Sequence, residues 1–431
     1  MKKICLPVSS KLVVFLTLYF FAGTLSGQRI THFSADSSQF IGELTVLFSG
    51  ISDQEKKIIA PGMADFAQKW NTGVFDLERK KTISLVCNEM VKKKIRVFPD
   101  FFDYLNTLNI FFNTHQPEAG FNPWSEILKK LIADKNTRKF LSFLESTKNL
   151  FAENLVYKSS STQWKMEQPE YRFFSDSVPS IEFSKSDLVC YANKDSLIIS
   201  HTRGIYYPLT NIWKGQEGRV NWIRAGEDPL QVYADLDRYE IQMRYSKYTA
   251  ESVSFHHTRY FPSPVTGQLV DKVLADVTEE KASYPRFYSY DKMIGIAHLF
   301  PNIDYIGGFA LEGSRVIGSG SPERDARLFF KNNGQDFVTA HSRTFIIHAD
   351  RINSNNASVT IYHDNDSIFH PGLQLKYIDD KKTLSLTRDE RVTTISPWFD
   401  SFHQIEMFCD AVYYKVGDQK INFEVIATPG K

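Results

Sequence analysis

The hydrophobic period of this sequence changes once, near residue 158, and that change constrains the fold more than any other feature. Between residues 38 and 158 the apolar positions recur at helical spacing, as Ile83, Val86, Cys87 and Met90 do. Beyond the change, stretches such as residues 218–224 alternate bulky apolar and polar residues, which is typical of half-buried strands. The sequence therefore predicts an α+β chain by segments: an N-terminal all-α helical domain, then an all-β region of solenoid, jellyroll or sandwich type.

Local signals predict where several helices begin and end. Ser52 and Glu55 have the spacing of a capping box, in which each side chain bonds the backbone N–H of the other residue. Pro61 and Gly62 are expected to interrupt the helix that follows, because both residues disfavour a helix interior. The pattern then predicts helices at residues 79–91, 100–112, 124–133 and 139–156, the last of them capped by Asp134 or Asn136.

The polar, serine-rich stretch Lys158-Ser-Ser-Ser-Thr-Gln163 indicates a linker between the two regions. We expect a helical domain over residues 28–157, a linker over 158–170 and a β-rich region over 171–431, divided into modules at 171–300 and 301–431. A strand pattern at residues 421–426 stands next to the end of the sequence, which would leave a sheet edge uncapped. Truncation of a longer protein at this end is one expectation that follows.

One short pattern occurs twice in the β-rich region. Residues 191–197 and 362–368 each carry Tyr, three turn-type residues, Asp-Ser and then an aliphatic residue. Asn and Asp accept turn geometry, and Asp-Ser can cap the returning strand. The pattern predicts a strand–turn–strand unit that is used twice, with chance repetition as the alternative.

The first 27 residues have the order of a cleavable secretory signal. Three lysines within the first eleven residues precede an uncharged apolar run over residues 12–22, and small residues follow. The run is shorter than the about 20 apolar residues of a membrane-spanning helix, although a retained anchor is the alternative. We expect cleavage after Ser26 or before Gln28, and an exported protein that is periplasmic, outer-membrane-associated or secreted. Gln28 stands where a lipoprotein needs Cys, which argues against a lipid anchor.

Charge and cysteine usage exclude several classes of partner and scaffold. A formal net charge of +1 gives no large electrostatic field, so we expect no nucleic-acid partner. Once the signal is removed, the cysteines that remain are Cys87, Cys190 and Cys409. They are widely spaced and odd in number, which predicts neither a disulfide framework nor a structural zinc site. One bridge at most can form, and three buried thiols are the alternative.

Two resemblances accompany these patterns. The Lys-Lys start with Gln28 at the new N-terminus resembles secreted proteins of Bacteroidota, and the whole chain resembles the large exported proteins of that group. This resemblance implies export and no particular activity. Over residues 180–431, the short strands with one turn pattern reused are similar to β-solenoid coils. More loosely, they are similar to the open β-jellyroll of OstA/LptA-type proteins, which carry lipopolysaccharide across a periplasm.

An aromatic cluster is the first candidate binding site. Aromatic residues make up 14% of the chain, and exposed ones on a β-scaffold can stack on sugars. The candidate ligand-binding residues lie near three glycines and are Tyr206, Tyr207, Trp213 and Trp222. The alternative is that alternate members such as Val220 and Trp222 form the core of the sheet.

A short polar cluster is the second candidate. Carboxylates and imidazoles within eight residues of each other could bind a divalent ion at a turn, and the candidate ligands are His363, Asp364, Asp366 and His370. An EF-hand-type loop is excluded, because Gly and Glu are missing at the required offsets. The alternative is a hairpin turn that uses Asp and Asn for its backbone geometry.

The sequence lacks the GxSxG and HExxH motifs, and we expect no cofactor. It favours a non-catalytic structural or ligand-binding protein of the envelope or exterior, with an envelope protein or a glycan as partner of its helical domain. One alternative is a polysaccharide-acting enzyme, which requires surface aromatics over a cleft with two carboxylates. The other is a periplasmic lipid or lipopolysaccharide shuttle, which requires a continuous apolar channel. A filled core favours the structural reading.

Overall fold

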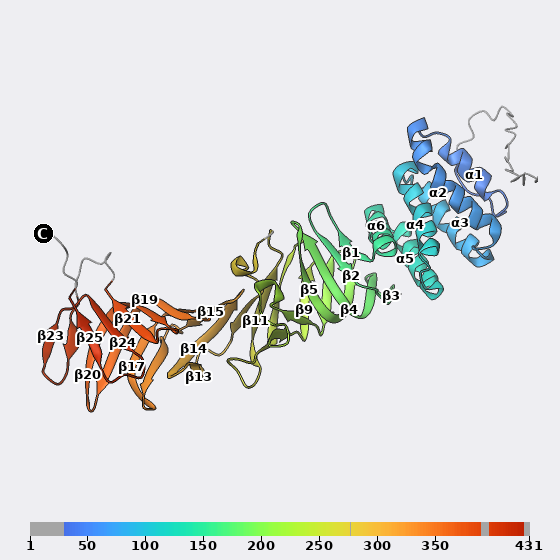
Figure 1. Cartoon of the computed structure of the whole chain (residues 1–431). Coiled ribbons are helices and arrows are strands. Elements are labelled where there is room, and N and C mark those ends of the chain that lie inside the picture. The colour runs from blue at the N-terminus through green and yellow to red at the C-terminus, as the bar shows by residue number, and fades with distance from the viewer. Residues whose placement is uncertain (1–29, 276, 389–395, 426–431) are drawn as a thin grey trace, which may run out of the picture.

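The computed structural model describes residues 30–275, 277–388 and 396–425, and it divides the chain where the hydrophobic period changes. A helical region over residues 40–153 is followed by an antiparallel β region over residues 155–425, which confirms the α+β organisation by segments. The molecule is elongated, with the helices at one end and the C-terminal strands at the other (Figure 1). The expected signal, residues 1–27, lies outside the described residues.

Six α-helices and one π-helical turn form the described part of the helical region. Their bounds are α1 Phe40–Phe48, α2 Asp53–Thr72, α3 Leu77–Lys92, the π-helical turn Val97–Phe101, α4 Phe102–Asn113, α5 Phe121–Ala133 and α6 Thr137–Glu153. Short 3-10 turns lie at Glu118–Gly120, Ile223–Ala225 and Glu279–Lys281.

The capping signals are confirmed where they are local. Ser52 N–H donates to Glu55 Oε2 at 2.8 Å, and Glu55 N–H donates to Ser52 Oγ at 3.3 Å, which is the predicted capping box of α2. Of the two candidates at α6, Asn136 is the cap and accepts from Arg138 N–H at 3.1 Å. These contacts satisfy backbone donors that the first turn of a helix leaves open.

The expected interruption at Pro61 and Gly62 is wrong, because α2 runs through both residues. The ring of Phe102 in α4 lies against the backbone of Gly62, where a Cβ atom would be 2.8 Å from Phe102 Cζ. Asn109 of α4 donates from Nδ2 to the Gly62 carbonyl oxygen at 2.8 Å. Packing against α4 therefore stabilises α2 across two residues whose intrinsic helix propensity is low.

Aromatic rings fill the interior of the helical region. Phe40 stacks on Trp70 with ring centroids 4.3 Å apart, and Phe111 lies parallel to Trp124 at 6.1 Å. The indole Nε1 of Trp124 donates to Thr147 Oγ1 at 3.1 Å, so the one polar atom of this buried ring has a partner. Part of the chain's aromatic content is thus explained by packing.

The β region consists of antiparallel strands joined mostly by short turns. Their bounds are β1 Leu155–Lys158, β2 Gln163–Met166, β3 Tyr171–Phe174, β4 Ser180–Ala192, β5 Asp195–Tyr207, β6 Ile212–Gln216, β7 Arg219–Asn221, β8 Val232–Asp235, β9 Arg238–Gln242, β10 Lys247–His257, β11 Val265–Lys272, β12 Arg286–Ser289, β13 Ile294–Phe300, β14 Ile303–Glu312, β15 Arg315–Ser319, β16 Ala326–Asn332, β17 Gln335–Ser342, β18 Thr344–Ile347, β19 Arg351–His363, β20 Asp366–Ile378, β21 Thr383–Thr387, β22 Trp398–Asp400, β23 Ile405–Met407, β24 Ala411–Lys415 and β25 Ile421–Glu424.

The segment expected as a linker, residues 158–170, contains the β1–β2 turn and strand β2. Ser159 N–H donates to the Thr162 carbonyl oxygen at 2.9 Å, and Ser159 Oγ accepts from Thr162 N–H at 3.0 Å. The serines therefore form a hairpin turn. Helix α6 passes into β1 through Asn154 alone, whose φ of 58° ends the helix in the left-handed region.

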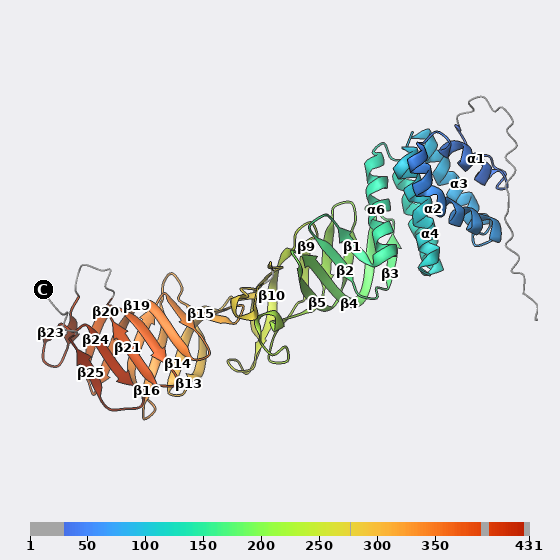
Figure 2. The same ribbon diagram turned by 45° about the horizontal axis from the view of Figure 1, so that its top comes forward.

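Long strands pair with two different short strands along one side. β4 pairs with β3 through its first half and with β2 through its second half. β5 divides in the same way between β6 and β7, and β20 between β21 and β22. Each long strand therefore bends and serves both layers of a flattened roll, which lengthens strand by strand away from the helices (Figure 2).

At the bends, backbone N–H groups that leave the strand ladder find side-chain acceptors. His201, Ser252 and His298 have positive φ angles of 55°, 55° and 54°. Their N–H groups donate to Asp187 Oδ1 at 2.8 Å, to the Tyr290 hydroxyl at 3.0 Å and to Asp304 Oδ1 at 2.8 Å, respectively. The bulges thus redirect the strands without leaving these donors unpaired.

The repeated sequence pattern lies in two hairpins of the same construction. β4 and β19 each have 13 residues, and each is joined through a two-residue turn to a partner of 13 residues, β5 or β20. Leu188 pairs with Ile199 in the first hairpin, and Val359 pairs with His370 in the second, 171 positions later. The ladders are interrupted at corresponding positions, so the unit is repeated in three dimensions.

The correspondence extends to the strands that follow each hairpin. β6 and β9 pair in the first unit as β21 and β24 do in the second. The pair Thr249 and Glu240, which joins β10 to β9, corresponds to Asn422 and Tyr413, which join β25 to β24. We therefore define a first repeat, residues 163–257, and a second repeat, residues 335–424, with β11 to β16 between them.

Large side chains fill the interior of the roll. The fully buried ones in this region include Trp164, Trp213, Trp222, Trp398, Tyr206, Tyr305, Tyr377 and Tyr414. The three thiols Cys87, Cys190 and Cys409 are all free and buried. Of the two expectations for the cysteines, the structure therefore has buried thiols without a bridge.

Gly215 gives a stability test of this packing. It faces Gly204 across the β5–β6 ladder, and a Cβ atom at Gly215 would be 2.2 Å from Tyr239 Cζ. We expect Gly215→Ala to lower the free energy of unfolding by about 1–3 kcal/mol, because the buried Tyr239 ring has to move. Urea denaturation measures the change. Gly295→Ala in β13 is the control, since a Cβ atom there meets nothing within 4 Å; equal losses in the two variants would contradict the prediction.

Candidate functional site

The candidate aromatic residues lie mainly inside the roll. Tyr206, Trp213 and Trp222 are 1%, 0% and 0% exposed, and Tyr207 is half-buried. β5 and β6 bring Tyr206 opposite Trp213 in the ladder, whereas Trp222 follows β7. Three of the four rings therefore offer no face to a sugar, and their placement matches the alternative in which alternate residues form the sheet core.

The contacts of these rings are with other side chains of the core. The ring of Trp213 lies 5.6 Å from that of Phe183, and the ring of Trp222 lies 5.2 Å from that of Phe255. Tyr207, the most accessible of the four, has Lys214 Nζ 5.5 Å from its ring centroid. One face of this half-buried ring is therefore in a cation–π contact.

The candidate metal ligands are spread over a turn and two strands. His363 and Asp364 lie at the exposed β19–β20 turn, where Asp364 has a φ of 50°. Asp366 starts β20 and accepts from Ser401 Oγ at 3.2 Å. Within the described ranges, no group of three or more His, Cys, Asp or Glu side chains is placed to hold a metal ion. The geometry at Asp364 is that of the predicted hairpin turn.

His370 is buried and has a structural role at a strand bend. Its Nδ1 accepts from Gly372 N–H at 3.1 Å, and its Nε2 lies 3.1 Å from the Ser396 carbonyl oxygen. These two contacts require the tautomer that carries its proton on Nε2. Gly372 in the second repeat corresponds to His201 in the first. His370 accepts the backbone N–H of Gly372 as Asp187 accepts that of His201, so both side chains stabilise a strand bend.

A buried ion pair that joins the first repeat to β11 was not apparent from the sequence. Asp271 of β11 is 1% exposed and forms a salt bridge with Arg224, and its Oδ1 also accepts from Lys272 N–H at 2.8 Å. Burial raises the pKa of Asp271, and the positive charge of Arg224 opposes that rise. Such pairs are costly to break, because the partner that remains is a buried charge.

A signal for this pair was present in β11. Leu269 and Asp271 alternate with exposed or half-buried residues and share the inward face of the strand. An acid at an inward position predicts a buried partner, since an isolated buried carboxylate is unfavourable. The identity of that partner was unreadable, because Arg224 is 47 positions away along the chain.

His257, at the end of β10, is a second buried polar group. It is 7% exposed, and its ring lies 4.3 Å from that of Tyr260. Its Nδ1 has no hydrogen-bond partner within the part of the chain that the structure describes. Burial, together with the positive charge of Arg259, lowers the pKa of His257 to about 4. The adjacent His256 pairs with Asp235 at 3.4 Å on the other side of the strand.

A cleft lies where the helices meet the roll. It has a volume of about 670 Å³ and is walled by α5, α6, the β3–β4 loop and the β5–β6 turn. Its charged lining residues are Lys130, Arg138, Lys139, Asp134 and Asp176. The cleft therefore contains three cations and two acids.

The charged groups of this junction cleft bond mostly to each other and to the backbone. Lys130 Nζ donates to the carbonyl oxygen of Ser175 at 2.8 Å and to its hydroxyl at 2.7 Å, which ties α5 to the β3–β4 loop. Lys139 Nζ donates to Asp134 Oδ2 at 2.9 Å. This hydrogen bond is the main reason that the pKa of Asp134 is lowered. The arrangement is suited to joining two domains and to holding a small polar group.

Apolar contacts complete the junction. Phe173 of β3 packs against Phe143 and Phe151 of α6, with ring centroids 6.3 and 6.1 Å apart. The hydroxyl of Tyr171 donates to Gln116 Oε1 at 2.5 Å. The helical region thus covers the first strands of the roll, and α6 stands beside them (Figure 2).

Comparison with protein-family models, with curated proteins and with solved structures finds no match for this chain. Among the described helices, none has the length and apolar character that a bilayer crossing requires.

His257 predicts a pH dependence of stability. Its pKa is lower in the folded protein than its ordinary value of 6.5, so the unfolded chain binds a proton that the folded chain excludes. The free energy of unfolding should therefore fall as the pH drops from about 6.5 to about 4, by about 3 kcal/mol from this group, and level off below. Urea denaturation across this pH range measures the slope.

His257→Leu should reduce that slope, because the side chain that gains the proton on unfolding is gone. His363→Gln is the matched control, since His363 is exposed at a turn and its loss should leave the slope in place. A His257→Leu variant with the slope of the unmodified protein would assign the pH dependence to other groups.

Proposed function

We propose that this protein is an exported, non-catalytic structural protein of the cell envelope or exterior. In this proposal the β-roll is a spacer that carries the helical domain at one end. The observation that carries it is the filled interior of the roll, in which Trp164, Trp213 and Trp398 are buried between the layers. An elongated body with a packed core resists bending and needs no bound ligand for its stability.

The polar groups described above support the same role. Four side chains accept hydrogen bonds from backbone N–H groups at the bends of the strands: Asp187, Tyr290, Asp304 and His370. These contacts stabilise the fold and do not depend on a substrate. The junction cleft supports it as well, because Lys130 ties the helices to the roll. In the proposal the helical domain is the end that contacts a partner, an envelope protein or a glycan.

A ligand and activity screen tests the non-catalytic part of the proposal. We expect no saturable binding of the lipid probe N-phenylnaphthylamine, because large side chains fill the roll, and no release of reducing ends from a panel of polysaccharides. Probe fluorescence and a reducing-sugar assay measure the two outcomes. Saturable probe binding that lipopolysaccharide displaces would establish the shuttle instead, and reducing ends released from one polysaccharide would establish the enzyme.

The first residue of the mature chain tests export. We expect the protein recovered from the envelope or the medium to begin at Gly27 or Gln28, because the order of basic, apolar and small residues before them is that of a signal peptide. N-terminal sequencing or mass spectrometry identifies the first residue. Recovery of a chain that begins at Met1 in the cytoplasm would overturn the assignment of the compartment.

A further inference from the structure

The two ends of the roll differ in how their terminal strands are covered. At the first end, β1 and β3 lie against α6 and α5, and Phe173 packs into the helical region. At the other end, in the described residues, β25 pairs with β24 alone and β23 pairs with β22 alone. Figure 1 places β23 and β25 at the far end of the molecule from the helices. A strand with one unpaired edge is a template for a further strand.

In the first repeat, the strand that corresponds to β25 is β10, and both of its edges are paired. There β10 pairs with β9, and β25 pairs with β24 in the matching register, Thr249 corresponding to Asn422. The other edge of β10 is covered by β11, which runs antiparallel to it and pairs Tyr248 with Asp271 and Ala250 with Leu269. The molecule itself therefore shows what kind of element closes an edge of this shape.

Side chains on β25 are more exposed than their counterparts on β10, as expected if β25 lacks a neighbouring strand equivalent to β11. Tyr248 and Ala250 of β10 are 5% and 1% exposed. Their counterparts on β25 are Ile421, which is half-buried, and Phe423, which is 37% exposed although its ring meets Trp398 at 5.6 Å. The first repeat thus buries positions that the second leaves accessible.

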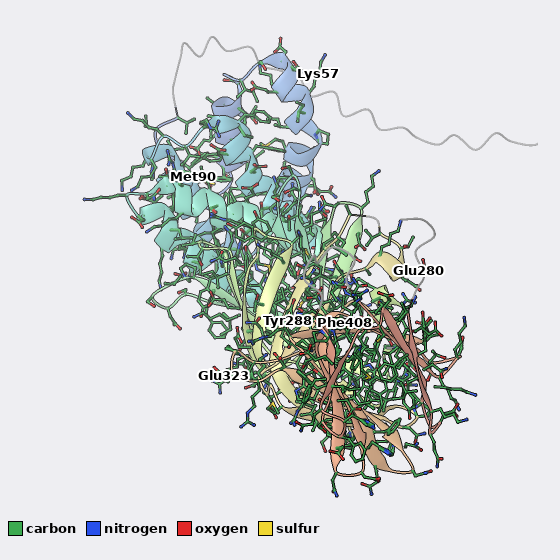
Figure 3. All side chains as sticks on the ribbon, turned by 90° about the vertical axis from the view of Figure 1, so that its left-hand side faces the viewer. Lys57, Met90, Glu280, Tyr288, Glu323 and Phe408 are labelled. Atoms are coloured by element: carbon green, nitrogen blue, oxygen red, sulfur yellow. The ribbon has the colours of Figure 1, made fainter. Side chains whose placement is uncertain are left out.

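Apolar side chains surround this end. On β23, Ile405 is 47% exposed, whereas Val232 at the corresponding place in β8 is 2% exposed. Phe402, Phe408 and Val425 are 68%, 59% and 74% exposed. Figure 3 looks at the molecule from this end and labels Phe408 among the last strands. An accessible cluster of large apolar groups beside an unpaired strand marks an interaction surface.

We propose that the edge of β25 that is unpaired within the described residues binds an extended segment of another polypeptide chain, which adds as a strand antiparallel to β25. The segment has the chemistry of β11, with an aliphatic residue opposite Phe423 as Leu269 is opposite Ala250. Main-chain hydrogen bonds supply affinity in this mode of recognition, and alternate side chains supply specificity.

The length of β11 favours a different chain over a second copy as the occupant. β11 has eight residues and pairs along β10 from Lys247 to Phe255. The described β25 has four residues, so two copies of β25 would form a ladder about half as long. A strand of β11 type can extend past β25 and cover the apolar residues beside it.

The test titrates a labelled peptide that carries residues 262–275, the β11 strand with its flanks, into the intact protein. In that protein the edge of β10 is already occupied by β11, so among the described strands β25 has the corresponding unpaired edge. We expect saturable binding by fluorescence anisotropy and slower hydrogen exchange of the β25 amides. Phe423→Lys should weaken binding about tenfold or more, because a lysine on the apolar edge opposes strand addition.

Matched controls separate strand addition from other effects. Asn422→Lys adds the same charge one residue away, on the other face of the strand, and should change the affinity less than about twofold. A peptide with Leu269→Lys, used with the unmodified protein, should lose affinity as the Phe423→Lys protein does, and it keeps the test valid if that variant folds poorly.

Three outcomes would overturn the proposal. They are binding without protection of β25, equal losses from Asn422→Lys and Phe423→Lys, and self-association of the protein, in analytical ultracentrifugation, that Phe423→Lys abolishes. The last outcome would make a second copy the occupant. The structural role proposed above rests on the filled roll and survives each of these results, while the lipid-probe and polysaccharide screen tests that role without involving β25.

Discussion

The fold depends on how its long strands bend. A strand that serves two layers must leave its ladder at the bend, and each N–H released there requires a new acceptor. Asp187 and Asp304 meet this requirement with carboxylates, Tyr290 with a hydroxyl and His370 with a ring nitrogen. The acceptors are chemically different, but each fixes one point at which the chain turns from one face to the other. Without such points the long hairpins would remain flat and could not enclose Trp213 or Tyr377.

The helical region covers the end of the roll that contains the first strands, β1 to β3. α6 runs into β1 almost without a connection, and its Phe143 and Phe151 cover Phe173 of β3. The first strands are therefore shielded by helices, in the way that terminal caps protect repeat proteins. The two segments, which differ in hydrophobic period, form one continuous body through this contact.

The sequence predicted what is local in this fold. The period change, the capping box at Ser52 and the twofold use of the hairpin around Tyr191 and Tyr362 all depend on residues within a few positions of each other. Two expectations failed for different reasons. α2 continues through Pro61 because α4, which is distant in the sequence, packs against it. The serine-rich stretch after Lys158 is the turn of a local hairpin between β1 and β2, and its polar composition is shared by turns and linkers.

The candidate sites show the same division. Alternation in the strand at Trp222 indicated two faces but did not say which face is inside, and the structure buries it. The cluster around His363 contained the correct turn residues. His370, however, stabilises the strand bend at Gly372, which corresponds to the bend at His201 in the first repeat, 171 positions earlier. The Arg224–Asp271 pair joins residues 47 positions apart, a relation that no local pattern carries. The inward position of Asp271 in β11 was the one readable sign of it.

The three buried cysteines have a consequence for watching the molecule come apart. Burial raises the pKa of the thiols of Cys87, Cys190 and Cys409, so each is both hidden and protonated in the folded state. One lies in the helical region, one in the first repeat and one in the second. Alkylation of each thiol by a membrane-impermeant reagent would therefore report the local opening of its own segment. The three native thiols therefore serve as separate probes of local unfolding along the chain. The order in which they are alkylated would show which segment unfolds first.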